Sequence, residues 1–220
     1  MILYHGSSRK FTRFSRQYFY SGEGNMSFGA GVYLAGHIET GKHYAMVAME
    51  ANKARMTEES GELLALQSKL NQDRVFRRGA DNLSVKDKEN IMNKISTLKY
   101  NLTNFKSQLI KLIYKVEIPN NILTNFLNMD AKFDQQKSNV KTSLKKIFGE
   151  TLDKDLTGLQ MYRILVDSKE GHENATNILE NSGIKGTIYL DAVSRGKNGG
   201  TYNYVVFDPS NVKIKECYEL

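Results

Sequence analysis

Short apolar runs occur toward both ends of the chain, and longer helical patterns fill the middle. The runs ILYH (2–5) and GVYLA (31–35) are brief, and the second begins at a glycine, which is typical of strands. Three more runs of this kind come near the end: IKGTIYL (184–190), NYVVFD (203–208) and VKIKE (212–216). Strands at both ends with helices between them favour an α+β fold over a parallel α/β sheet.

The middle of the chain carries the pattern of a helical hairpin. Apolar residues recur there at alternating four- and three-residue steps, which mark the seam of one helix packed along another. These residues are Ile91, Ile95, Leu98, Leu102, Phe105, Leu109 and Leu112. Ser84 and Asp87 form a capping-box pair at the start of this helix. We therefore predict that residues 57–111 are a helical hairpin inserted into a single domain of residues 1–220.

The remaining elements follow from local spacing and from glycine and proline. Leu63, Leu66 and Leu70 repeat at helical spacing and mark the first helix of the hairpin, and RRGADN (77–82) supplies its turn. Further helices are predicted at 38–56, 135–148 and 175–180, the last one stopped by Ser182 and Gly183. A strand is predicted at 113–118, where Pro119 stops it.

Composition narrows the classes of protein that fit. Of the 220 residues 40% are hydrophobic and 25% are charged, which is typical of a globular domain. No apolar run approaches the roughly 20 residues needed to span a bilayer, and a secretory signal is not recognised. We therefore expect a cytoplasmic protein with no membrane partner. A lone Cys217 excludes an internal disulfide and a cysteine-based metal cluster.

The net charge of +7 bears on the choice of partner. A basic protein favours polyanions, such as nucleic acid, a nucleotide or an acidic protein. A Lys-rich and Asn-rich coding bias gives the same number, so the charge alone leaves both explanations open.

Three strand-borne pieces carry the candidate chemistry. The chain has no GxxxxGK[ST], GxSxG or HExxH motif. What remains is YHGSS, then FGAGVYLA with HYA one helix later, and finally TYNYVVFDPSNVKI. Together they resemble the His-Tyr-Glu class of ADP-ribosyltransferases, which includes diphtheria-toxin-like and PARP-like proteins. The set looks most like the bacterial and phage branch of that class, found in polyvalent proteins and toxin systems.

The resemblance covers residues 1–50 and 112–216 and leaves the hairpin as an addition. It implies an α+β fold with a split sheet, mixed or antiparallel, and a domain that uses NAD as co-substrate. The catalytic set that it implies is His5, Tyr33 and Asn203.

The resemblance also gives each matching residue a role toward NAD. His5 would hydrogen-bond ribose hydroxyls, because imidazole offers one donor and one acceptor. The backbone of Gly6, next to Ser7 in the same motif, would meet the nicotinamide carboxamide. Tyr33 and Tyr44, eleven residues apart as in the class, would stack on the two faces of the nicotinamide ring.

Basic and aromatic residues near these motifs are candidates for binding phosphates and the target. Arginine suits bidentate contact with a pyrophosphate, and the candidates for it are Arg9, Lys10, Arg13 and Arg16. The loop SRGKNGGTY lies where the class places its target-recognition loop. Its candidate target contacts are Arg195, Lys197 and Tyr202, the last of which can stack on a base.

The chain departs from the class at the catalytic end, where Asn203 stands in place of the glutamate. A carboxylate there would orient the ribose 2′-hydroxyl and stabilise the oxocarbenium-like state. Asparagine accepts a hydrogen bond but carries no charge. Three outcomes stay open: Asn203 suffices as the orienting group, a neighbour such as Asp191 supplies the charge, or the fold has lost activity.

The sequence thus favours an NAD-dependent mono-ADP-ribosyltransferase, of the toxin or antiviral-defence type, acting on a macromolecule. Positive charge and the aromatic loop tilt the expected target toward nucleic acid, RNA included, over protein. An inactive module that binds NAD or nucleic acid, and an NAD glycohydrolase, are the alternatives. The predicted hairpin is a candidate docking site for a target, a chaperone or an antitoxin.

Overall fold

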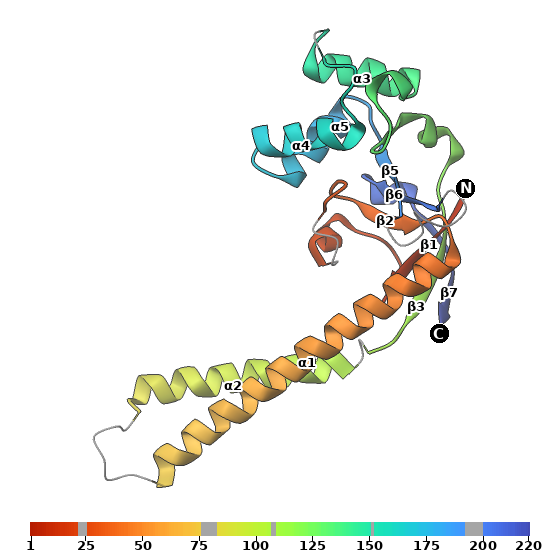
Figure 1. Ribbon diagram of the computed structural model, residues 1–220. Coiled ribbons are helices and arrows are strands. Elements are labelled where there is room, and N and C mark those ends of the chain that lie inside the picture. Colours follow the sequence, from red (N-terminus) through yellow and green to blue (C-terminus); the bar gives the residue numbers. More distant parts are fainter. Residues whose placement is uncertain (22–25, 76–82, 107–108, 151, 192–199) are drawn as a thin grey trace.

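The computed structural model describes residues 1–21, 26–75, 83–106, 109–150, 152–191 and 200–220. In this part of the chain, five α-helices accompany one mixed sheet of seven strands (Figure 1), which confirms the predicted α+β class. The strands are β1 (Ile2–Ser7), β2 (Val32–Ala35), β3 (Leu112–Glu117), β4 (Phe126–Asn128), β5 (Gly186–Leu190), β6 (Tyr202–Val206) and β7 (Lys213–Glu219). The helices are α1 (Ile38–Val75), α2 (Val85–Lys106), α3 (Ser138–Phe148), α4 (Gly158–Ser168) and α5 (His172–Asn181).

The sheet consists of two well-paired parts that meet at β1 and β2. Its strands are ordered β4-β5-β6-β2-β1-β3-β7, and only β4 and β5 run parallel. β1 pairs with β3 over six residues, and β2 pairs with β6 over four. In contrast, the register between β1 and β2 holds a single pair, Tyr4 with Ala35. The backbone pairing between the two parts is therefore limited to that one pair in the described register.

Both faces of the sheet are covered, so its central strands are apolar on both sides. Along the segment that includes β6, Val205 and Phe207 pack with α3, α4 and α5, whereas Tyr204 and Val206 belong to the core on the other side. We call the first side the helix face and the second the aromatic face. The aromatic face is named for the rings that gather on it, which are Phe11, Phe14, Phe19 and Tyr114.

α1 begins on the helix face of β1 and then continues away from the sheet (Figure 1). A Cβ atom at Gly41 would lie 3.0 Å from that of Tyr4 in β1, so the two elements are in close contact. The helix runs without a break through residue 57, for 38 residues in all. The helix predicted from Ile38 and the first helix of the predicted hairpin are therefore one element.

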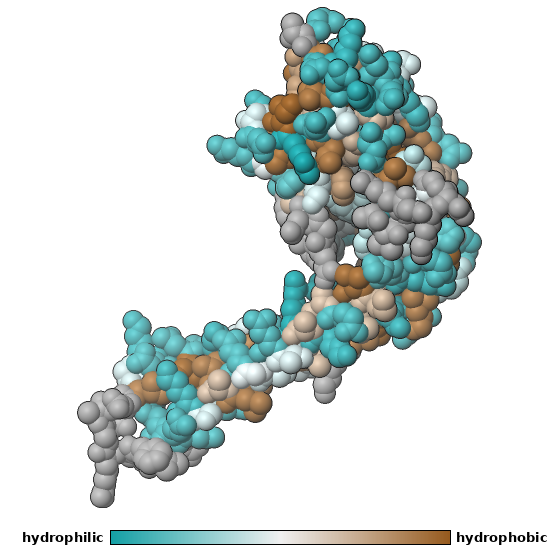
Figure 2. All heavy atoms as spheres, viewed as in Figure 1, coloured by the Kyte–Doolittle hydropathy of each residue, from teal (hydrophilic) through white to brown (hydrophobic). Residues whose placement is uncertain are grey.

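α2 packs antiparallel to the distal part of α1 and completes the hairpin (Figure 1). Ion pairs join Lys94 to Glu62 and, at 2.7 Å, Lys88 to Asp73. On the side of the hairpin that Figure 2 shows, hydrophobic and hydrophilic residues are interspersed. The exposed large hydrophobic side chains of the hairpin include Leu64, Val85, Met92 and Tyr100.

The predicted seam of α2 is right as far as Phe105 and wrong beyond it. α2 ends at Lys106, and Leu112 is the first residue of β3, where it pairs with Ser7. The apolar spacing continued past the helix because Leu112 is a core residue of the strand that follows. The predicted turn, 77–82, lies outside the described residues.

The predicted cap of α2 is present. The Ser84 hydroxyl accepts a hydrogen bond from the backbone N–H of Asp87 at 3.1 Å and donates one to the Asp87 carboxylate at 2.6 Å. Ser84 therefore satisfies one of the free N–H groups of the first turn, as an N-cap does.

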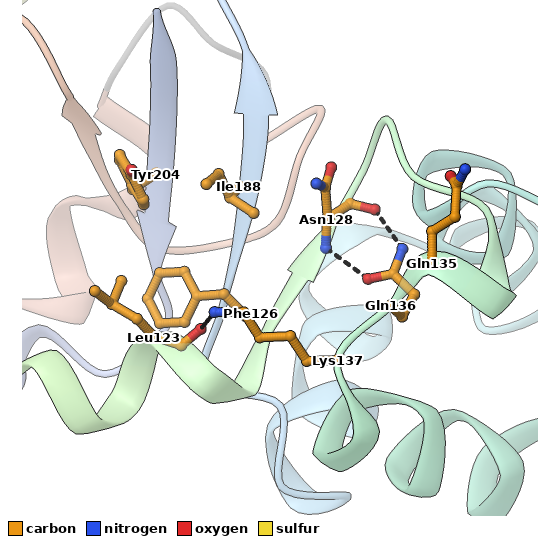
Figure 3. Close-up of a pocket in the computed structure, with 8 residues that line it drawn as sticks. All are labelled: Leu123, Phe126, Asn128, Gln135, Gln136, Lys137, Ile188 and Tyr204. Atoms are coloured by element: carbon orange, nitrogen blue, oxygen red, sulfur yellow. Dashed lines mark hydrogen bonds between the residues drawn. The ribbon is translucent and has the colours of Figure 1, made fainter.

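The outer edge of β4 is closed by one side chain. The Gln136 Oε1 atom accepts from the Asn128 N–H at 3.0 Å, and its Nε2 atom donates to the carbonyls of Asn128 and Ala131 at 2.7 and 2.8 Å (Figure 3). The side-chain amide thus takes the place of a neighbouring strand, which protects an edge from pairing with another chain.

A pocket lies beside this edge, between the sheet and the segment that precedes α3 (Figure 3). Its polar wall is already bonded within the protein: Lys137 donates to the Leu123 carbonyl at 2.9 Å, and Gln136 binds the β4 backbone. None of the residues predicted for the functional site lines it.

Candidate functional site

Neighbouring strands gather the predicted site residues on the helix face. Directly opposed residues of antiparallel strands point to the same side, and the register aligns Ala35 of β2 with Asn203 of β6, and Asn203 with Tyr189 of β5. Tyr33 lies two residues before Ala35 and therefore shares that side. Tyr44 reaches the same place from α1, where its hydroxyl contacts Asn203.

Asn203, Asp191 and Tyr44 form a hydrogen-bonded group. The Asn203 Nδ2 atom donates to the Asp191 Oδ1 atom at 3.2 Å and lies 3.4 Å from the Tyr44 hydroxyl. That hydroxyl in turn donates to Asp191 Oδ1 at 3.4 Å. Asn203 and Asp191 are 2% and 1% exposed, whereas Tyr44 is 41% exposed. A buried polar pair thus lies under a ring that is open to solvent.

The Asn203 amide has a defined orientation. A carboxylate only accepts hydrogen bonds, so the amide must turn its NH₂ group toward Asp191. Its Oδ1 atom is then directed elsewhere, and this buried atom has no hydrogen-bond partner among the described residues. An unsatisfied buried acceptor costs about 1–3 kcal/mol. The site therefore holds an acceptor that a donor on a ligand would satisfy.

Tyr33 and Tyr189 provide aromatic surface in the same cluster. The Tyr33 hydroxyl donates to the Gly29 carbonyl at 3.0 Å and accepts from the Phe28 N–H at 3.2 Å. Phe28 stacks on Tyr189 with the ring centroids 3.8 Å apart. Burial raises the pKa of both phenols, so both stay neutral at physiological pH. The Tyr33 hydroxyl is thus occupied, and its ring is what remains for a ligand.

The phenol of Tyr44 also stays protonated. Burial, followed by the adjacent Asp191 carboxylate, raises its pKa, because a phenolate beside a carboxylate would be repelled. The hydroxyl can therefore donate to Asp191, and this bond fixes the ring of Tyr44 relative to Asn203.

His5 is joined to this cluster through the backbone of Tyr33. Its Nδ1 atom lies 2.9 Å from the Tyr33 carbonyl oxygen, and because a carbonyl only accepts, Nδ1 carries the hydrogen. Its ring meets Phe14 edge-on at 5.1 Å and Phe11 at 5.9 Å. His5 therefore lies among the rings of the aromatic face. The side chains of Tyr33, Tyr44 and Asn203 come together on the helix face.

Burial lowers the pKa of His5 below its usual value of 6.5, against a smaller opposing effect of the Tyr33 carbonyl. The imidazole is therefore neutral near pH 7. Since Nδ1 holds the hydrogen, the lone pair is on Nε2, and the ring offers an acceptor at that atom.

The lowered pKa predicts a loss of stability in acid. Below pH 6.5 the unfolded chain binds a proton at this residue before the folded chain does, so the free energy of unfolding falls as the pH drops from 6.5 toward the folded-state value. We expect a smaller drop for His5→Gln, measured by urea unfolding at pH 7.5 and pH 5. His43→Gln, at an exposed position of α1, is the control and should behave as wild type does. An equal drop in all three proteins would contradict the prediction.

Gly6 is required by the close approach of α1. A Cβ atom at this position would lie 2.2 Å from the Gly41 carbonyl oxygen, 2.4 Å from the Ala45 nitrogen and 3.0 Å from the Tyr44 carbonyl carbon. No side chain fits there. The glycine thus lets the helix carry Tyr44 directly over the first strand.

The backbone of Gly6 faces the gap between β1 and β2. Met1 exchanges hydrogen bonds with Ile118 at 2.8 and 3.0 Å, so the N–H and C=O groups of Met1 point toward β3. These directions alternate along a strand, so those of Tyr4 and Gly6 point toward β2. Tyr4 has its partner Ala35, but the described register has no pair at Gly6. The Tyr33 carbonyl, which would complete that pair, binds the His5 ring instead.

The other predicted binding residues have varied surroundings. The Ser7 hydroxyl closes a turn with the backbone of Arg9, at 3.0 and 3.1 Å. Arg16 binds both carboxylate oxygens of Glu180 in α5 at 2.9 Å, so a phosphate would have to compete with that ion pair. Tyr202 is 40% exposed at the start of β6. The predicted target contacts Arg195 and Lys197 lie outside the described residues.

Lys10 and Arg13, the other two phosphate candidates, are exposed on the segment that leads away from β1. Tyr189 and Phe28 were not predicted as site residues. A signal for Tyr189 exists in the sequence: Thr187 and Tyr189 of β5 and Asp191 just after it occupy alternate positions, and all three are buried in the structure.

Comparison with protein-family models, with curated proteins and with solved structures found no match for this chain. In the described part, no three His, Cys, Asp or Glu side chains are grouped so that they could hold a metal ion. No described helix combines the length and the apolar character needed to cross a membrane. The function is therefore argued from the site itself.

Proposed function

We propose that this protein is an NAD-dependent mono-ADP-ribosyltransferase with the split-sheet fold of that class. The observation that carries the proposal is the buried Oδ1 atom of Asn203, a residue beside Tyr44: in the part of the chain that the structure describes, this atom has no hydrogen-bond partner. The resemblance in sequence requires an acceptor at this position for the ribose 2′-hydroxyl. The single pair between β1 and β2 supports a sheet that is split where the cofactor would enter.

The surrounding groups match the parts of NAD in kind. Tyr44, open to solvent, and Tyr33 offer aromatic surface to the nicotinamide ring, which is cationic before the bond breaks. The backbone N–H and C=O of Gly6 face the gap beside Tyr33, where they suit the donor and acceptor of a carboxamide. The neutral imidazole of His5, whose ring lies on the aromatic face, would offer Nε2 to a ribose hydroxyl that reaches that side of the sheet.

In the proposed reaction, the bond between C1′ of the ribose and N1 of nicotinamide breaks, and its electron pair stays on nicotinamide. A nucleophilic oxygen or nitrogen of the acceptor then bonds to C1′, and its proton goes to water. Asn203 accepts from the 2′-hydroxyl, which stabilises the oxocarbenium-like state in between. Because Asn203 brings no carboxylate to activate a second ribose, transfer ends after one unit.

The first test is whether the protein turns NAD over. Purified protein with NAD and a cell extract should release nicotinamide, with an equal amount of ADP-ribose attached to a macromolecule. NAD should also raise the melting temperature, because a ligand that binds only the folded state stabilises it. A reaction without protein is the blank. No nicotinamide release with any acceptor would leave a non-catalytic module as the better description.

The second test separates the acceptors. We expect the label from NAD to be attached to a macromolecule that nuclease removes and protease leaves intact. The net charge of +7, together with the exposed ring of Tyr202, favours a nucleic acid. Label that protease removes and nuclease leaves would identify a protein target. Free ADP-ribose as the main product would identify an NAD glycohydrolase, with water as the acceptor.

A further inference from the structure

We propose that Asp191 is the positioning carboxylate of this site: it holds the Asn203 amide with its oxygen toward the ligand and supplies the negative charge that the amide lacks. The inference rests on the proposed function and assigns to Asp191 a share of the work that the glutamate does in the class. Asp191 lies just after β5, twelve residues before Asn203 in the sequence.

The backbone of Asp191 is held by the sheet. Its N–H donates to the Thr201 carbonyl at 2.8 Å, which extends the pairing of β5 with β6 by one step beyond Leu190 and Tyr202. Asp191 is two residues from Tyr189 and thus points to the same face as Asn203. The carboxylate is therefore placed by the same two strands that place Asn203.

One oxygen of Asp191 orients two groups. Oδ1 accepts from Asn203 Nδ2 at 3.2 Å and from the Tyr44 hydroxyl at 3.4 Å. Without a carboxylate there, the amide could turn over, and its Nδ2 rather than Oδ1 would then face the ligand. The same loss would release the Tyr44 ring. Asp191 thus sets both the acceptor and the stacking surface.

The carboxylate also acts through charge. An amide whose NH₂ group donates to a carboxylate is polarised, so its oxygen becomes a stronger acceptor. At 1% exposure Asp191 is shielded from water, so dissolved salt screens its charge less than it screens a surface carboxylate. The nicotinamide and the oxocarbenium-like state are both cationic. A neutral Asn203 can therefore serve, because the carboxylate of Asp191 supplies the negative charge from one hydrogen bond away.

The test is the kinetics of nicotinamide release by Asp191→Asn, which keeps the size of the side chain and removes its charge. We expect kcat to fall about 100-fold, as expected when a reacting group is misplaced, with a smaller change in the KM for NAD. Asp208→Asn is the matched control, because Asp208 lies beyond the other end of β6 and accepts from Ser210. It should keep the wild-type kcat.

The double variant Asp191→Asn/Asn203→Asp exchanges the two groups within the same space and keeps one carboxylate, so it tests the charge even where the single variant unfolds. We expect it to recover to within about tenfold of the wild-type kcat. A wild-type kcat for Asp191→Asn, or a double variant no better than an inactive single one, overturns the role of Asp191 alone. An inactive wild type overturns the proposed function and this inference with it.

Discussion

Replacing Gly6 with alanine is expected to lower the free energy of unfolding by about 3 kcal/mol, at the upper end of the cost of overpacking. The added methyl group would lie 2.2 Å from the Gly41 oxygen and 2.4 Å from the Ala45 nitrogen. Both atoms belong to backbone, which cannot turn aside as a flexible side chain can. The helix must therefore move off the strand, and Tyr44 moves with it. Urea unfolding measures the loss of stability.

Gly61 is the control for this prediction. It lies in the same helix, and a Cβ atom there would meet nothing within 4 Å. Gly61→Ala should therefore raise the free energy of unfolding by up to about 1 kcal/mol, the difference in helix propensity. The same substitution would then change the free energy of unfolding in opposite directions at Gly6, which lies against α1, and at Gly61, which belongs to α1. A Gly6→Ala protein as stable as wild type would show that α1 does not lie on β1 as described.

Replacing Asn203 with leucine is expected to lower the kcat for nicotinamide release by about 10²- to 10³-fold, as for the loss of one preorganised group that stabilises the transition state. Leucine keeps the branching and the number of heavy atoms of the side chain but removes the acceptor Oδ1 together with the donor Nδ2. The loss should appear mainly in kcat, because the contact with the 2′-hydroxyl strengthens as charge develops on the ribose. Steady-state kinetics, with NAD affinity measured by calorimetry, would separate a loss of kcat from a loss of NAD binding.

Gln136→Leu is the control for Asn203→Leu. Both replace a buried amide, but Gln136 makes three hydrogen bonds to the backbone of the β4 region, away from the predicted site. We expect Gln136→Leu to lower stability and leave kcat unchanged. Equal kcat losses in both variants would mean that Asn203 matters only for folding.

The strands and most helices could be predicted from local patterns because their apolar spacing and the residues that end them are visible in the sequence. ILYH, GVYLA and NYVVFD correspond to β1, β2 and β6 within two residues at each end. β4 was missed because three residues carry no usable period. α4 was missed although its signal is present: Thr157 and Gln160 form a capping box, with hydrogen bonds of 3.3 and 2.8 Å.

The site was predictable in part, for a similar reason. Spacing and motif indicated Tyr33, Tyr44 and Asn203, and these residues meet on one face. The His5 ring binds the Tyr33 carbonyl from the aromatic face, and this contact depends on the position at which the pairing of β1 with β2 ends. The orientation of Asn203 depends on Asp191, which belongs to another strand. Both facts come from strand pairing between distant segments, which local spacing does not encode.

The length of α1 links the arm of the molecule mechanically to the site. At 1.5 Å per residue, a helix of 38 residues is about 57 Å long. Tyr44 lies in its second turn, near the point where Gly6 supports it, and the hairpin occupies its other end. At that point Gly6 of β1 lies against the backbone of the helix. Because Tyr44 and the arm belong to one continuous helix, a rotation of α1 on β1 would change the position of Tyr44 above Asn203 as well as the direction of the arm.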